Sequence, residues 1–203
     1  MTTLPSTETP PEEYAEPPEF LANDLSVGVR LWTASAAFFF LTFVFAFFYL
    51  RSLNMNNQWK PHGVDAPTGW GVAILACIVA SVVVYWFAVR LGSEERWRLP
   101  ALVALVLAVA AGVIQCVEWA VMSWGPTNGG YASVFIGWTA FYLLFLIGVI
   151  YWMETLVAES YRGGEGAEER AVVRRANAEA LNLFWLFLGL VAVAAFIILY
   201  LVA

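Results

Sequence analysis

Charged residues are scarce in this chain. Only 13% of its 203 residues are Asp, Glu, Lys or Arg, whereas soluble domains carry about 25%. Hydrophobic residues make up 61% and aromatic residues 16%. This balance argues against a soluble globular domain. The formal net charge of −6 does not indicate a basic partner, because six acids lie in the first 25 residues and half of the others lie between Glu159 and Glu179.

Histidine and cysteine are almost absent, which limits metal chemistry. His62 is the only histidine, so this chain alone cannot supply two histidines to haem or copper. Cys77 and Cys116 lie in apolar runs without CxxC spacing, and we expect both to pack as small hydrophobic side chains. We also find no Ser/His/Asp set, phosphate loop, nucleic-acid patch or secretory signal in the sequence. We therefore expect neither a metal site nor a catalytic site.

Long uncharged runs are abundant. The clearest, from Tyr131 to Met153, has 23 residues. At about 1.5 Å per residue it is long enough to cross a hydrocarbon core of roughly 30 Å, and in lipid it must be helical. Trp138 near its start and Trp152 near its end suit the two membrane interfaces. The sequence predicts an all-α polytopic membrane protein with five transmembrane helices, at about 31–50, 70–89, 99–122, 132–155 and 182–203.

Composition divides the chain into two parts. Residues 1–25 are acidic and Pro-rich and predict a flexible tail, and residues 26–203 form the membrane domain. Within that domain, Pro100 is expected in the first turn of the third span. Residues 159–179 are expected to form a polar link that contains a short surface helix.

The basic residues predict the orientation. With a cytoplasmic N-terminus and five spans, two bases, Arg51 and Lys60, lie outside. The other eight lie inside, so the positive-inside rule places the N-terminus in the cytoplasm and the C-terminus outside. These eight are Arg30, Arg90, Arg96, Arg98, Arg162, Arg170, Arg174 and Arg175.

Six residues are candidates for contact with lipid or with partner subunits. Four lie at the outer surface and two in or near the membrane: Arg51, Trp59, Lys60, His62, Glu118 and Glu154. Two interpretations of Glu118 stay open. In the first interpretation, the carboxyl bonds to a neighbouring span or reaches water at the outer interface. In the second, it faces a partner subunit or a lipid headgroup.

Other residues of the spans predict packing. Gly112, Gly137 and Gly148 would allow helices to approach closely. The phenylalanines between residues 38 and 48 cover every face of the first span, which indicates packing against both lipid and protein rather than a cofactor site.

Several segments resemble subunit III of the haem-copper oxygen reductases, the cytochrome c oxidase subunit 3 family. They are FFYLRSL (47–53), DAPTGWG (65–71), GGYASVFIGWT (129–139), YWMETLVAESYR (151–162) and the closing NAEALNLFWLFL (177–188). The likeness extends over nearly everything after residue 26. The chain is similar to the short bacterial form, which has five helices and lacks the first two of the seven-span members.

The resemblance implies a non-catalytic core subunit of an aerobic respiratory terminal oxidase of the aa3 or caa3 type, in the bacterial plasma membrane. Its expected partners are oxidase subunit I, oxidase subunit II and structural phospholipids, a respiratory supercomplex is left open, and no nucleic acid is expected. Haem and copper are expected in the partner subunits and none in this chain. The complex would transfer electrons to oxygen and would couple this transfer to the pumping of protons.

The chain departs from the family at several membrane positions. The family commonly carries a Glu three residues before a Phe-Phe pair, and alignment on Phe39-Phe40 places Ala36 there. The usual histidines of the next-to-last helix fall on Phe141 and Leu144. These departures favour structural and lipid-holding roles over proton handling.

Alternatives remain open. The chain is also compatible with an accessory subunit of a nitric oxide reductase or of a quinol oxidase, because other subunits determine the electron donor. A free-standing small transporter would need a polar pathway, and apart from Glu118 the span interiors hold almost no ionisable residue. A membrane scaffold unrelated to oxidases is the last alternative.

Overall fold

The computed structural model describes residues 18–54, 58–91, 94–161 and 167–203, and these residues contain helices and no strand. Each of the five α-helices contains a run long and apolar enough to cross a membrane. The prediction of an all-α, multi-pass membrane protein is therefore confirmed. The helices are α1 (Pro18–Ser52), α2 (Thr68–Arg90), α3 (Glu94–Val121), α4 (Gly130–Ser160) and α5 (Ala167–Phe196), which continues as the π-helix η1 (Ile197–Val202).

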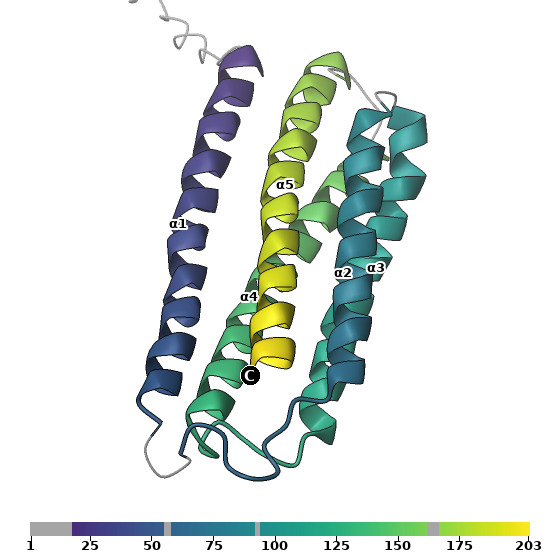
Figure 1. The fold of residues 1–203 in the computed structure, drawn as a ribbon. Helices are drawn as coiled ribbons and strands as arrows, with labels where there is room; N and C mark the ends of the chain where they lie inside the picture. The colour runs from purple at the N-terminus through teal and green to yellow at the C-terminus, as the bar shows by residue number, and fades with distance from the viewer. Residues whose placement is uncertain (1–17, 55–57, 92–93, 162–166) are drawn as a thin grey trace, which may run out of the picture.

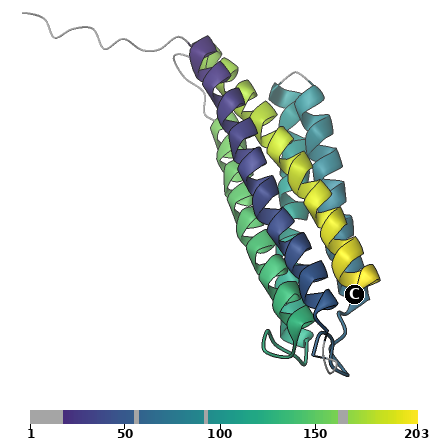
Figure 2. The ribbon, with the colours of Figure 1, turned by 60° about the vertical axis from the view of Figure 1, so that its left-hand side comes forward.

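The five helices run side by side along one bundle axis (Figures 1 and 2). Helix α5 packs against α1, α2 and α4, while α2 pairs with α3 and α3 with α4. The start of α1 and the C-terminus lie at opposite ends of the bundle (Figure 1). The C-terminal end also carries the α1–α2 and α3–α4 connections. That this end faces outward stays a prediction.

Small residues bring α2 and α3 together. The hydroxyl of Ser81 on α2 donates a hydrogen bond of 2.7 Å to the carbonyl of Ala104 on α3. The same hydroxyl accepts a 3.2 Å bond from the indole Nε1 of Trp185 on α5. Ala104 belongs to a stripe of alanines without exposed surface, which lets backbones approach closely. The stripe is Ala101, Ala104, Ala108 and Ala111.

Aromatic rings hold α1 against α4 and α5. Phe39 packs on Phe141 with ring centroids 5.1 Å apart, and Phe40 packs on Phe145 at 5.2 Å. Phe38, in contrast, is 76% exposed on the outer face of α1. The phenylalanine run therefore packs against protein on one side and is exposed on the other, as predicted.

Two boundaries differ from the predictions. Helix α1 begins at Pro18, so residues 18–25 are helical rather than part of a flexible tail. A proline is well suited to this first turn, because its fixed φ is helical and its missing N–H has no intrahelical acceptor there. Residues 1–17 lie outside the described part of the chain. Helix α3 begins at Glu94, which places Pro100 inside the helix beyond the first turn, where it removes one backbone hydrogen bond.

The polar link and the fifth span also differ from the prediction. They form one continuous helix from Ala167 to Phe196 instead of a surface helix followed by a separate span. Residues 167–180 are rich in Ala, Glu and Arg, which have high helix propensity. Arg175 and Glu179 form an i,i+4 ion pair of 3.2 Å on this segment, which further favours a helix.

Candidate functional sites: an apolar groove and a buried carboxylate

An apolar groove lies between the first half of α1 and the second half of α4, with Phe184 of α5 also lining it. Its volume is about 730 Å³. Trp32 and Trp152 line it from the two helices, and Asp24 is the only ionisable residue among the described residues that line it. The rings of Trp32 and Phe184 pack 6.2 Å apart. A groove of this size and character can receive a hydrocarbon chain, with an acid near one end.

Two glycines, one on α1 and one on α4, line this groove. A Cβ built on Gly28 of α1 or on Gly148 of α4 meets no heavy atom within 4 Å. The prediction that Gly148 allows close helix approach is therefore wrong, because the missing side chain leaves open space instead. A Cβ at Gly137 would lie 3.4 Å from Phe43, and such contact agrees with the prediction for that residue.

A carboxylate is buried on the other side of the bundle. Glu118 of α3 has no exposed surface. Its Oε2 accepts a 2.7 Å hydrogen bond from Nε2 of Gln115, one turn earlier, and its Oε1 accepts a 2.7 Å bond from the hydroxyl of Tyr200 in η1. Of the two interpretations of Glu118, the structure adopts the bond to a neighbouring span.

Four contacts position Tyr200 in addition to its bond to Glu118. Its ring stacks on Phe196, with centroids 5.3 Å apart, and meets Phe135 of α4 edge-on at 5.4 Å. Beside it lies Gly71 of α2, where a Cβ would stand 2.5 Å from Cε1 of the tyrosine. The hydroxyl of Tyr131 donates a 2.7 Å bond to the carbonyl of the preceding Leu199. The π-helical end of the chain is thus anchored to α2, α3 and α4.

Sequence reasoning missed the partners of Glu118. The i,i+3 spacing of Gln115 and Glu118 is the one sequence signal that could have linked two of them. Tyr200 is 82 residues away from Glu118, and no local pattern connects it with Gly71 or with the carboxylate.

Three of the candidate outer residues, Arg51, Trp59 and Lys60, take part in intramolecular contacts. Arg51 is exposed and donates from Nη1 to the carbonyl of Val202 at 2.8 Å, so it links the end of α1 to η1. Trp59 is only 6% exposed, and its ring meets those of Phe47 and Tyr131 edge-on at 5.0 and 5.9 Å. The Trp59 side chain therefore packs mostly inside this chain, and its predicted contact with lipid or a partner subunit stays a prediction.

The other candidates do not form a common site. Lys60 pairs with Asp65 at 3.0 Å and lies 5.1 Å from the ring centroid of Tyr131. His62 is exposed in the α1–α2 connection, and Glu154 is exposed on α4 near the opposite end of the bundle. Their predicted contacts with lipid or partner subunits stay predictions.

No metal centre is formed by the residues that the structure describes, since none of their His, Cys, Asp and Glu side chains gather in groups of three or more. Cys77 is half-buried and Cys116 is exposed, and neither forms a disulfide. Most polar side chains in the spans are hydrogen-bonded to other helices or to their own helix.

This arrangement defines the class of the protein: a multi-pass helical membrane protein whose buried polar groups join its helices to one another. A sequence model of the family Cytochrome c oxidase subunit III matches residues 16–203. The chain therefore belongs to the cytochrome c oxidase subunit III family, as its sequence motifs predicted.

Curated relatives carry the same family name. The "Cytochrome c oxidase subunit 3" of Struthio camelus is 32% identical over 132 residues, 61% of this chain and 50% of that protein. The protein of the same name from Pyricularia grisea is 28% identical over 141 residues (65% and 52%), and that from Podospora anserina is 26% identical over 136 residues (63% and 51%). The chain spans about half the length of the curated relatives that it matches.

Proposed function

We propose that this chain is the non-catalytic subunit III of a bacterial respiratory terminal oxidase of the aa3 or caa3 type in the plasma membrane. In this role it packs against subunit I and holds structural phospholipid, while subunits I and II carry haem and copper, electron transfer to oxygen and proton pumping. The family match over residues 16–203 supports the assignment to an oxidase. The groove between α1 and α4 supports the lipid-holding role.

The lining of the groove suits a phospholipid tail with its headgroup at the membrane interface. Hydrophobic side chains from three helices surround the volume, and the two glycines leave it open. Indole rings favour the interfacial region of a membrane, and Trp32 and Trp152 both line the groove, which supports a headgroup position at this end. The exposed carboxylate of Asp24 lies where it could receive the ammonium of a zwitterionic headgroup.

Filling the groove tests the lipid-holding role. Gly148→Leu places an isobutyl group in the groove without meeting a neighbouring atom at Cβ. We expect the complex to assemble but to retain less phospholipid after detergent purification, measured as phosphate per complex and by lipid mass spectrometry. Gly69→Leu is the matched control, because a Cβ at Gly69 also meets nothing within 4 Å and this residue lies outside the groove. Equal lipid retention by both variants would exclude the groove as the holding site.

Purification of the tagged chain from native membranes tests the assignment to the complex. We expect subunits I and II to co-purify in mild detergent, with a haem a band in the reduced-minus-oxidised spectrum and cytochrome c-dependent oxygen uptake. Haem b signals with nitric oxide consumption would move the chain to a nitric oxide reductase. A colourless protein without partners would contradict both assignments.

A further inference from the structure

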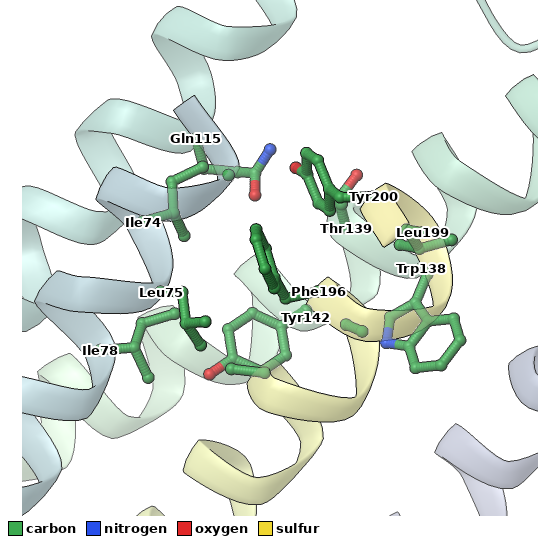
Figure 3. A pocket seen from close by; sticks show the side chains of 13 residues that line it. Ile74, Leu75, Ile78, Gln115, Trp138, Thr139, Tyr142, Phe196, Leu199 and Tyr200 are labelled. Atoms are coloured by element: carbon green, nitrogen blue, oxygen red, sulfur yellow. The ribbon is translucent and has the colours of Figure 1, made fainter. Parts of the chain in front are cut away.

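The hydroxyl groups of one pocket already have partners inside the chain. This pocket has a volume of about 40 Å³ and lies beside Tyr200, between α2, α3, α4 and the end of α5 (Figure 3). The hydroxyls of Tyr142 and Thr139 donate to backbone carbonyls at 3.1 and 2.8 Å, and the hydroxyl of Tyr200 donates to Glu118 at 2.7 Å. None of these three O–H groups needs a ligand as its acceptor.

A second pocket lies at the end of the bundle that carries the α1–α2 and α3–α4 connections (Figure 1). Its volume is about 630 Å³, and its walls come from both connections, the last turn of α1 and the start of α4. No Asp, Glu, Lys or Arg is among the described residues that line it. The polar residues of its lining are Asn54, Gln58, His62, Thr127 and Asn128.

The two connections hold each other in place around this second pocket. The backbone N–H of Gly130 donates to the carbonyl of Gln58 at 3.1 Å, and that of Tyr131 donates to the carbonyl of Trp59 at 2.9 Å. Gly129 lies so close to the same segment that a Cβ on it would stand 2.9 Å from the carbonyl oxygen of Gln58. These contacts join the described walls to one another, so the pocket is formed without a ligand.

The asparagines of the lining have already used their amide oxygens. Oδ1 of Asn54 accepts a 3.1 Å bond from the backbone N–H of Trp59, and Oδ1 of Asn128 accepts a 2.8 Å bond from the backbone N–H of Gly125. Each amide nitrogen keeps two N–H donors, and neither nitrogen has an acceptor in the part of the chain that the structure describes. The side chains of the other three polar lining residues form no hydrogen bond there either. The pocket therefore offers more donors than acceptors.

Such a lining suits a carboxylate. An ionised carboxylate only accepts hydrogen bonds, and the described lining contains no acid that would repel it. His62 is exposed and adds an N–H donor and, when it is protonated, a positive charge. A phosphate group is a poorer match, because phosphate is typically bound by Arg or Lys, and neither is among the described lining residues.

We propose that this pocket receives an Asp or Glu side chain from an extramembrane segment of a partner subunit. Pockets of roughly 300–1,000 Å³ accommodate drug-sized molecules, so there is room for the acid and for neighbouring residues of its segment. The connections lie beyond the ends of the spans, where an extramembrane segment reaches them. This inference rests on the proposed function, because it requires a partner in the complex.

Replacing Asn128 by Asp tests the proposal in the intact complex. The aspartate keeps an oxygen that accepts from Gly125 and replaces the unbonded NH₂ group by a second, negatively charged oxygen. We expect the tagged Asn128→Asp chain to dissociate from the purified complex in mild detergent roughly tenfold faster than the wild type, because a hydrogen bond to a charged group is lost and a like charge is gained. Asn54→Asp makes the same change on the other connection and should also speed dissociation.

Asn23→Asp is the matched control. Asn23 is exposed near the start of α1, at the opposite end of the bundle from the pocket. This variant carries the same change of charge and should dissociate at the wild-type rate. Because the expected repulsion is electrostatic, the difference between Asn128→Asp and Asn23→Asp should shrink as salt is raised.

Carbodiimide coupling identifies the acid. His62→Lys places an amine at the pocket, and the carbodiimide joins a neighbouring carboxyl to this amine as an amide. We expect mass spectrometry to find the introduced lysine joined to an Asp or Glu of a partner subunit. No coupling to a partner acid, wild-type dissociation of both Asn→Asp pocket variants, or density of a lipid or a free small acid in the pocket would each overturn the inference, while co-purification of the wild-type chain with its partners would keep the proposed function. A wild-type chain that purifies without any partner would overturn both.

Discussion

Replacing Gly71 by Ala should loosen the anchoring of the chain end to the bundle. The added Cβ would stand 2.5 Å from Cε1, 2.7 Å from Cζ and 2.8 Å from Cδ1 of Tyr200. Non-bonded carbon atoms are normally about 3.5–4.0 Å apart, so the ring must move by roughly 1 Å or more. It cannot do so freely, because its hydroxyl is bonded to Glu118 and its ring stacks on Phe196.

The expected cost has two parts. Overpacking a tight interior contact costs about 1–3 kcal/mol. Loss of the bond between Tyr200 and Glu118 adds about 0.6 kcal/mol, the average for interhelical hydrogen bonds in a membrane protein, with a maximum of about 1.7 kcal/mol. We therefore expect Gly71→Ala to lower the free energy of unfolding by about 1.6–3.6 kcal/mol. For a chain of this length, each kcal/mol lowers the unfolding midpoint by about 2–4 °C.

Thermal unfolding of the purified chain in detergent, followed by tryptophan fluorescence, measures this loss. Gly69→Ala, two residues earlier in α2, is the matched control, because its Cβ meets no atom within 4 Å and a compatible Gly→Ala change often stabilises. In a Tyr200→Leu background the Gly71→Ala change should cost less than about 0.5 kcal/mol, because the ring that it would meet is gone. An unchanged midpoint for Gly71→Ala, or full additivity with Tyr200→Leu, would refute the reasoning.

Three further changes test other contacts by the same unfolding measurement. Gly129→Ala should destabilise the fold by about 1–3 kcal/mol or more, because the residue has φ +118° and an added Cβ would lie 2.7 Å from a carbon of Pro61. Stability equal to that of the wild type would show that the turn tolerates a side chain. Ser81→Ala should cost about 1–3 kcal/mol because it leaves the buried indole N–H of Trp185 unpaired, and a neutral result would mean that this N–H finds another acceptor. Lys60→Met should cost less than about 1 kcal/mol, because its partner Asp65 is largely exposed to solvent; a larger loss would assign Lys60 a structural role beyond that pair.

The sequence alone determined the number and type of the spans. A run such as Tyr131–Met153, long enough to cross a bilayer and free of charge, has only one way to satisfy its backbone in lipid, and that way is local to the helix. The same information could not locate the helix ends. Helix α5 extends back to Ala167 through charged residues that lie outside the hydropathy signal but favour helix by their propensity.

Tertiary structure decided what the individual residues do. Gly148 and Gly71 are both glycines in spans, yet one opens a groove and the other receives the ring of Tyr200. Trp59 and Trp32 are both tryptophans near a membrane interface, yet the first is buried and the second is exposed. These outcomes depend on how each helix is rotated about its axis and on which neighbour it meets. Rotation and neighbours are set by side-chain packing between segments far apart in the sequence, and an all-round apolar span leaves no periodic pattern from which to read them.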